Sequence, residues 1–200
     1  MTRVTILLVL CAMLQLTSGC YSPKPIDAAY FTSKPAMSVT IGRCPEKAQM
    51  QDSGQGGLIG VMVNAGRASA MREAMTGIAG DAVKELVRQR FTEKMEEHFD
   101  VADDGQLKTV IDIYQWGWFA PSTVAGIRTG SYQFLLSGAV TITDSQQKDK
   151  KVAFLRQEAR EVIGNKPTPE VSQQALLKCA DKFAADTVAF LAKEKAGKPR

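Results

Sequence analysis

The sequence predicts an α+β fold, in which a largely antiparallel sheet of about four strands carries two long helices packed on one face. Two observations predict it. Apolar residues recur three to five positions apart over residues 68–99 and again over 168–193, which is typical of amphipathic helices. Before and between these stretches apolar residues alternate with polar ones, which is typical of half-buried strands.

The first strand and the first helix follow a polar N-terminal stretch. Residues 37–41 alternate apolar with β-branched and polar residues, and we expect a strand there. The helical periodicity then covers about residues 68–99. Gly77 and Gly80 weaken its middle by about 1 kcal/mol each relative to alanine. The element is therefore either one helix or two, and in the second case we expect Asp81 to cap the second helix.

Residues 109–119 are expected to form a central strand, because both of its faces are rich in apolar residues. Strict alternation divides these residues between the two faces: Tyr114, Trp116 and Trp118 on one, Ile111 and Ile113 on the other. We interpret the aromatic row as the surface against which the helices pack. If the row is exposed instead, it is a platform for a ligand or a peptide.

The second half of the chain predicts a hairpin and a closing helix. Residues 132–143 alternate cleanly, and a polar turn leads to a further strand over residues 151–163. The last helix runs from Thr168, a capping residue followed by proline, to about residue 193.

The N-terminus resembles the signal of bacterial lipoproteins. Arg3 precedes an apolar run over residues 4–16, which is too short to span a membrane, and small residues lead to Cys20. The resemblance implies that residues 1–19 are a signal peptide and that Cys20 carries acyl chains. Tyr21 follows the cysteine. In the enterobacterial family an Asp there favours the inner membrane, so we expect the outer membrane, facing the periplasm.

Removal of residues 1–19 leaves 200 − 19 = 181 residues, enough for one domain with a substantial core. Residues 20–35 are expected to be a tether, with Tyr30 and Phe31 as its first contact with a single domain over residues 36–195. Residues 196–200 are expected to be a frayed tail. The formal charge of +4 becomes +3 when Arg3 is lost, and the basic residues are scattered. We therefore expect no nucleic-acid partner.

One basic cluster stands out, and it comprises Lys148, Lys150 and Lys151. We interpret it as a solvated loop.

Four cysteines have separate roles: Cys11 belongs to the signal and Cys20 takes the lipid. For Cys44 and Cys179 two alternatives stay open, a disulfide in an oxidising compartment or two buried thiols. With His98 as the only histidine, the ligand count of a zinc site is not reached.

Residues 52–67 are rich in glycine and lack a helix or strand period. Three interpretations are open: a loop that packs on the domain, an apolar surface for a partner or a second copy, or insertion at a membrane surface. We predict that the apolar residues of this segment contact a partner; they are Leu58, Ile59, Val61, Met62 and Val63. No Gly-Lys-Ser/Thr follows the glycines, which argues against a phosphate-binding loop.

The sequence contains no motif of a nucleophile with its base and no metal-binding motif, so we expect neither an enzyme nor a cofactor. The order of elements over residues 28–192 resembles that of small envelope lipoproteins, such as the auxiliary components of membrane transport systems. The resemblance implies a non-enzymatic accessory that binds the membrane through Cys20 and docks an envelope protein. The alternative is a carrier that binds a lipid or small apolar ligand between sheet and helices. The sequence leaves the oligomeric state open.

Overall fold

The computed structural model of the 200-residue chain describes residues 22–52, 69–120, 123–124, 127–128, 131–148, 150–163 and 166–193. Several predictions fall outside these ranges. They concern the signal peptide 1–19, the lipidated Cys20, the contact residues 58–63 with most of the Gly-rich segment, and the tail 196–200.

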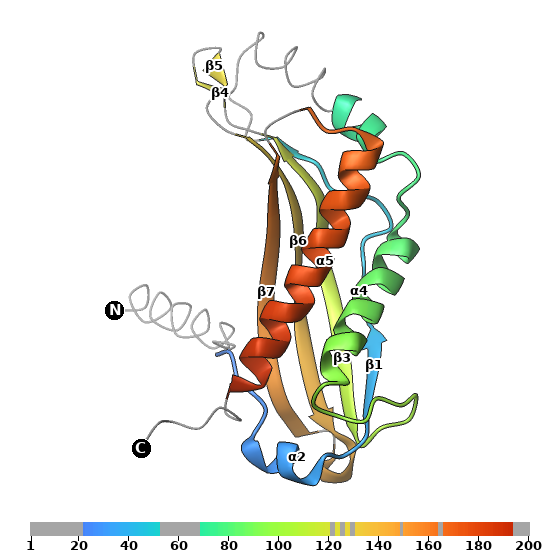
Figure 1. Ribbon diagram of the computed structural model, residues 1–200, viewed down its shortest axis with the longest axis vertical. Coiled ribbons are helices and arrows are strands. Elements are labelled where there is room, and N and C mark those ends of the chain that lie inside the picture. Colours follow the sequence, from blue (N-terminus) through green and yellow to red (C-terminus); the bar gives the residue numbers. More distant parts are fainter. Residues whose placement is uncertain are drawn as a thin grey trace, which may run out of the picture.

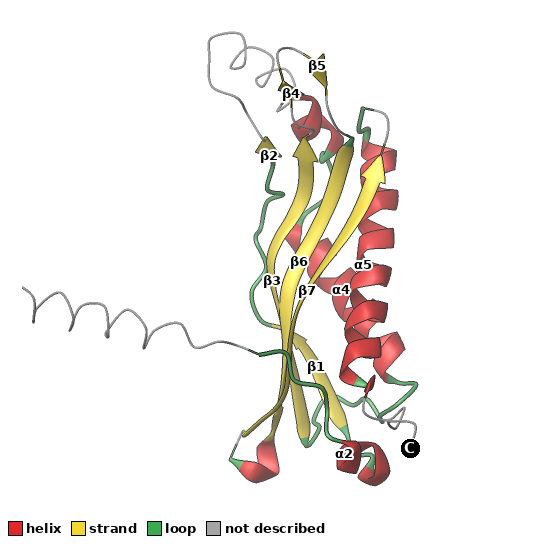
Figure 2. Ribbon diagram, turned by 90° about the vertical axis from the view of Figure 1, so that its left-hand side faces the viewer, coloured by secondary structure: helices red, strands yellow, loops and turns green. Residues whose placement is uncertain are grey.

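The main sheet is built from β1 (Met37–Ile41), β2 (Gln51–Asp52), β3 (Leu107–Ala120), β6 (Tyr132–Asp144) and β7 (Lys150–Ile163). Its strand order is β1-β3-β6-β7, and β2 pairs with the far end of β3 (Figure 2). A separate antiparallel pair consists of β4 (Thr123–Val124) and β5 (Ile127–Arg128). The predicted hairpin is confirmed: β6 and β7 are antiparallel neighbours joined by a short 3₁₀ turn.

The sheet is mixed, so the prediction of a largely antiparallel sheet was wrong in this respect. Strand β6 is antiparallel to both of its neighbours, β3 and β7, whereas β1 and β2 both run parallel to β3. The physical reason is the helix between β1 and β3. A helical crossover carries the chain back to the end from which it came, so the next strand runs in the same direction as the first. The α+β class and the four principal strands were predicted correctly.

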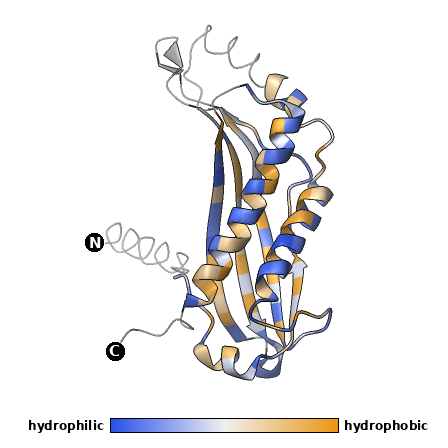
Figure 3. Cartoon of the chain, in the orientation of Figure 1, coloured by the Kyte–Doolittle hydropathy of each residue, from blue (hydrophilic) through white to orange (hydrophobic). Residues whose placement is uncertain are grey.

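Two long helices, α4 (Gly80–Met95) and α5 (Pro169–Leu191), cover one face of the sheet (Figures 1 and 2). The start of α5 is as predicted, because the side chain of Thr168 accepts a hydrogen bond from the amide of Val171 at 3.3 Å. Hydrophobic and hydrophilic residues alternate along both helices, as amphipathic periodicity requires (Figure 3). The sheet-facing residues of α5 belong to one continuous hydrophobic cluster with the sheet.

The glycine-weakened stretch is a real joint. Residues 69–74 are helical, and Gly77, with a φ of 86°, separates them from α4, so the two-helix interpretation is confirmed. The predicted cap was wrong. The N-cap residue is Ala79, whose methyl side chain cannot form a capping hydrogen bond. Asp81 lies in the first turn of the helix, where it forms an ion pair with Lys84 at 2.8 Å.

A β-bulge changes which residues of β3 face the helices. The register with β6 shifts between Ile113 and Gln115, so Tyr114 is an extra residue and stays 37% exposed. Ile111 lies opposite Val140 and Trp116 lies opposite Leu136, two residues of β6 that share a face. The predicted division into two faces was therefore wrong. The isoleucines and both tryptophans lie together in the core, where they are at most 1% exposed.

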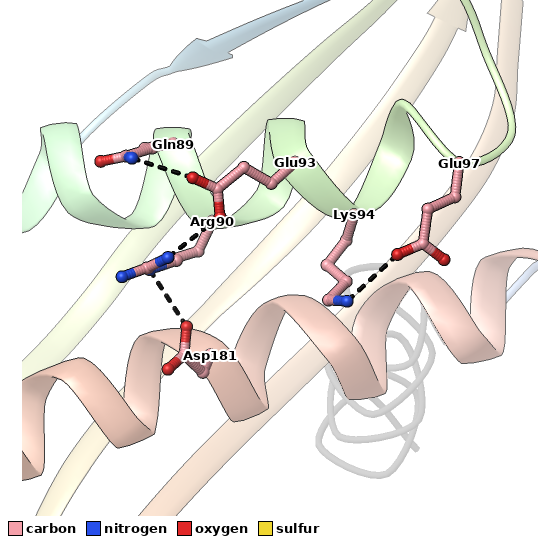
Figure 4. Close-up of polar contacts among 6 residues, drawn as sticks. All are labelled: Gln89, Arg90, Glu93, Lys94, Glu97 and Asp181. Carbon is pink, nitrogen blue, oxygen red and sulfur yellow. Dashed lines mark hydrogen bonds and ion pairs between the residues drawn. The ribbon is translucent and has the colours of Figure 1, made fainter.

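Among the described residues, one ion pair joins the outer surfaces of the two long helices, and Figure 4 shows it with two of those that lie along α4 and its C-terminal end. Arg90 of α4 pairs with Glu93 on its own helix at 3.0 Å and with Asp181 of α5 at 3.1 Å. Lys94 and Glu97 form a further pair at 3.1 Å. Such exposed pairs contribute about 0–1 kcal/mol each, so packing on the sheet is what holds the helices in place.

Candidate functional site

The N-terminal segment, residues 22–33, packs against the domain and is not a free tether. The backbone of Lys24 exchanges two hydrogen bonds with Phe154 of β7, at 2.8 and 2.9 Å, and the amide of Ile26 donates to the carbonyl of Leu191 at 3.0 Å. Ile26 is fully buried. The prediction that residues 20–35 are a tether was therefore wrong for residues 24–33.

The two prolines that indicated a linker are compatible with this docking. Pro23 and Pro25 have no amide hydrogen, but the residues that donate are Lys24 and Ile26, which alternate with them. A proline-containing segment can therefore lie along the edge of a sheet, provided that each proline occupies a position that need not donate.

A short helix, α2 (Ala28–Ser33), follows and closes the lower end of the sheet (Figure 1). The carboxylate of Asp27 caps it by accepting a hydrogen bond from the amide of Ala29 at 2.9 Å. Phe31 is buried, and its ring centroid lies 5.1 Å from that of Phe99 and 6.0 Å from that of His98. The prediction that Tyr30 and Phe31 contact the domain is confirmed, although the contact begins earlier, at Lys24.

A buried carboxylate lies beneath α2. Asp144, the last residue of β6, is fully buried and accepts hydrogen bonds from the Tyr30 hydroxyl at 2.9 Å and the Gln147 amide at 2.9 Å. It also accepts from the Gln106 amide at 3.2 Å and from the backbone amide of Gln146 at 3.0 Å. We call these five residues the Asp144 network. It joins α2, the start of β3 and the β6–β7 turn.

The network sets the charge of its two ionisable members. Burial alone would raise the pKa of Asp144, but the hydrogen bonds from Tyr30, the two glutamine side chains and the Gln146 amide together outweigh it and lower that pKa below its usual value. Burial, and then the bond to the Asp144 carboxylate, raise the pKa of Tyr30. At neutral pH the aspartate is therefore ionised and the tyrosine is protonated, which is the pairing that the geometry needs.

A polar cavity of about 420 Å³ opens beside the network. Its lining comes from the N-terminal segment, α2 and the start of β7: Lys24, Asp27, Ala29, Tyr30, Ser33, Gln147, Lys150 and Val152. Two lysines and one acid, Asp27, thus border a cavity that also contains hydroxyl and amide groups, so the cations outnumber the anion by one. This composition suits an anionic, hydrogen-bonding ligand rather than an apolar one.

The site offers little for covalent or metal chemistry. Within the described ranges no cluster of three or more His, Cys, Asp or Glu residues could hold a metal ion. The partners of the Asp144 carboxylate are hydrogen-bond donors from α2, the start of β3 and the β6–β7 turn. We therefore assign this carboxylate a structural role. Sequence reasoning had assigned it to a turn. One signal could have revealed it: Asp144 continues the alternation of Val140 and Ile142, so it is an acid in an inward-facing position.

Cys44 and Cys179 are both free thiols in this structure, the first half-buried and the second buried. A disulfide between them in an oxidising compartment stays a prediction. The half-buried Cys44 directs its thiol at the carbonyls of Pro45 and Gly80, at 3.6 and 3.8 Å. The buried Cys179 directs its own at the carbonyl of Phe134, at 3.6 Å. Burial raises the pKa of Cys44 to about 11 and that of Cys179 to about 12, which makes both poor nucleophiles at neutral pH.

The remaining predicted sites are distributed as follows. Trp116 and Trp118 are core residues, and the Trp118 indole donates to the buried Ser172 hydroxyl at 2.9 Å, so they form no exposed platform. Cys20 and the contact residues 58–63 lie outside the described ranges.

Among the described residues, no helix combines the length and the apolar character needed to cross a membrane.

No family model and no curated protein matches the sequence. Similar solved structures include a protein of the DUF330 family from Xanthomonas campestris, with 11% identity and a TM-score of 0.46, covering 88% of this chain and 98% of that one. Another is a minor lipoprotein from Acinetobacter baumannii, with 10% identity and a TM-score of 0.42, covering 82% of this chain and 96% of that one. This likeness is too distant to carry an inference about function.

Proposed function

We propose that this chain is a lipid-anchored lipoprotein of the bacterial envelope that acts as a non-enzymatic accessory in a periplasmic or outer-membrane transport or assembly system. One observation carries the proposal. A lipoprotein-like signal ends at Cys20, and only four residues later Lys24 is hydrogen-bonded to β7. An anchor at Cys20 therefore holds the domain within about 14 Å of the lipid, since an extended residue spans at most about 3.6 Å.

The short connection supports a scaffold rather than a mobile domain. A long flexible linker would let the domain search a wide volume, whereas four residues fix its height above the membrane. The docked segment then transmits the position of the anchor to β7 and α5, which Lys24 and Ile26 contact. A protein that presents a rigid surface at a fixed height is suited to docking a partner in the same membrane.

The carrier alternative has less support. A carrier needs a cavity between the tryptophans of β3 and the helices, but none of three cavities bordered by described residues is lined by Trp116 or Trp118. All three are bordered by polar side chains. The space beneath the helices is filled by buried residues such as Phe134 and Phe183.

Replacement of Cys20→Ser tests the lipid anchor. Cells that express the variant are labelled with a palmitate analogue, and we expect that both the label and membrane attachment are lost. Cys44→Ser is the matched control, because it removes a thiol of the folded domain and should leave both unchanged. Labelled, membrane-bound Cys20→Ser protein would contradict the proposal. Crosslinking in intact cells with mass spectrometry then identifies the partner.

A further inference from the structure

Four lysines gather where the N-terminal segment meets the start of β7. The bridge between Lys24 and Phe154 brings Lys24 beside the lysines that sequence reasoning had interpreted as a solvated loop. Lys24 and Lys150 line the same cavity, Lys148 is exposed at the turn, and the Lys151 ammonium lies 5.1 Å from the ring centroid of Phe154. We call Lys24, Lys148, Lys150 and Lys151 the lysine cluster.

The charge of the lysine cluster is only partly balanced nearby. Within the described residues neither Lys24 nor Lys150 forms an ion pair. Two neighbouring acids keep their negative charge, because both accept hydrogen bonds only from neutral donors: Asp27 caps α2, and Asp144 is buried among its donors. One further acid, Asp149, lies between the lysines in the sequence, outside the described ranges. The four lysines outnumber the three acids by one, and the lysines of the described ranges are exposed whereas Asp144 is buried, so the surface beside the cavity is net positive.

The position of the cluster relative to Cys20 indicates what this surface meets. Lys24 is four residues from Cys20, which is at most about 14 Å of extended chain. The attraction of basic residues to anionic lipids fades within the Debye length, about 8 Å at physiological salt, so it acts only on charges held close to the membrane. The lysine cluster is close enough to the anchor to meet this condition. Lys166 follows the far end of the 14-residue strand β7, roughly 40 Å from Lys150, and is too distant to meet it.

We propose that the lysine cluster rests on an anionic phospholipid surface and orients the domain on the membrane, with the cavity receiving a lipid phosphate. The inference rests on the proposed lipidation of Cys20. Acyl chains supply the attachment and a basic patch supplies the second, orienting contact. Anchored at one point only, the domain could rotate freely about Cys20. With the cluster in contact, the β7 edge near Lys24 faces the membrane and the helix layer stays accessible to a partner.

Lysine footprinting of the full lipidated protein tests this. The protein is reconstituted into vesicles of phosphatidylcholine, with or without phosphatidylglycerol, acetylated briefly, and analysed by mass spectrometry. We expect acetylation of the lysine cluster to fall several-fold on the anionic vesicles and to recover at high salt. Lys166 is the internal control, and its acetylation should be equal on both.

A matched pair of variants sharpens the test. In Lys148→Glu/Lys150→Glu/Lys151→Glu, Lys24 should lose its protection on anionic vesicles, whereas Lys166→Glu should retain it. If the triple variant does not fold, the wild-type footprint alone decides. Equal acetylation on both vesicles, with the protein still vesicle-bound, overturns the inference but leaves lipidation intact. Protein that floats with neither vesicle refutes both. Protection in intact cells but not on anionic vesicles assigns the cluster to an acidic protein and overturns the inference.

Discussion

The N-terminal segment and helix α5 are both attached to the same sheet, but by different forces. Helix α5 buries a continuous apolar face that includes Ala175, Cys179 and Phe183. Its attachment is spread over many contacts, each of which is weak alone. The N-terminal segment depends instead on a few backbone bonds, on Ile26 and Phe31, and on the hydrogen bond from Tyr30 to Asp144.

The difference predicts how each region fails. Loss of a core residue beneath α5 removes packing that the whole domain shares, so the domain should unfold as a unit. Loss of one polar bond in the Asp144 network should loosen the N-terminal segment locally, because the segment is retained by few contacts and each of them carries a large share of its attachment. If the segment orients the domain on the membrane, local release changes orientation without unfolding the domain.

The largest effect is expected in the core. Trp118→Ala leaves a cavity beside Phe134, whose ring centroid lies 5.2 Å from that of Trp118, and leaves the Ser172 hydroxyl without its donor. We expect a loss of about 3–5 kcal/mol in the free energy of unfolding, measured by urea denaturation. Trp118→Phe, which keeps an aromatic ring, should lose clearly less. A loss below about 1 kcal/mol for the alanine variant would show that this tryptophan is not part of a packed core.

The Asp144 network should give a smaller and local effect. Asp144→Ala leaves the Tyr30 hydroxyl and the Gln106 amide without their acceptor and removes one of the two acceptors of the Gln147 amide. We expect a loss of about 2–3 kcal/mol. Asp104→Ala, at an exposed turn, is the control and should stay within about 0.5 kcal/mol of the wild type. If both variants are equally stable, the buried carboxylate does not hold α2.

The stability should also depend on pH through this network. The pKa of Asp144 is lower in the folded chain than in the unfolded one, so its contribution is complete above about pH 4 and is lost as pH falls through the lowered value. The pKa of Tyr30 is raised, so its contribution is present below about pH 10 and is lost as pH rises through the raised value.

Urea titrations of wild type, Asp144→Asn and Tyr30→Phe over a range of pH measure these two losses. The difference between wild type and Asp144→Asn should shrink in acid, and that between wild type and Tyr30→Phe should shrink in strong alkali. Parallel curves for all three proteins would show that the two groups titrate alike in the folded and unfolded chains.

The smallest effect concerns the cysteines. Because burial raises both pKa values, alkylation of the native protein near pH 8 should be slow, and Cys44 should react before the more deeply buried Cys179. In denaturant without reductant both should react fully. Failure of both to react in denaturant would mean that they are joined as a disulfide in the exported protein.

Much of the fold could be predicted because its strands and helices follow periodic patterns of apolar residues in the sequence. The alternation in β6 and the cap, proline and apolar face of α5 are local patterns, and the structure contains both elements as expected. The direction of β1 was missed although the helix between β1 and β3 signals a parallel pair. The bulge at Tyr114 was missed because one extra residue in a run that is apolar on both faces leaves no mark in the pattern.

The site was predicted less well than the fold. Tyr30 was recognised as a contact, but Asp144, Gln106 and Gln147 were not. Asp144 and Gln147 are close in the sequence, but Tyr30 and Gln106 lie far from both and reach Asp144 only when α2, β3 and β6 assemble. Pro23 and Pro25 favoured the interpretation as a linker. The sequence alone does not show that the amides of the neighbouring Lys24 and Ile26 donate hydrogen bonds to the domain. Lys148, Lys150 and Lys151 were interpreted as a solvated loop because the sequence does not show that Lys24 pairs with β7 beside them.

Hydrogen exchange of the N-terminal segment tests the central claim most directly. The amides of Lys24 and Ile26 donate to β7 and to the end of α5, so in the native protein they should exchange far more slowly than in an unstructured peptide. In Asp144→Ala, exchange over residues 22–33 should accelerate while residues 134–142 of β6 stay protected. Exchange of residues 22–33 at the unstructured rate in the wild-type protein would contradict the account, because the domain would then hang from a free tether.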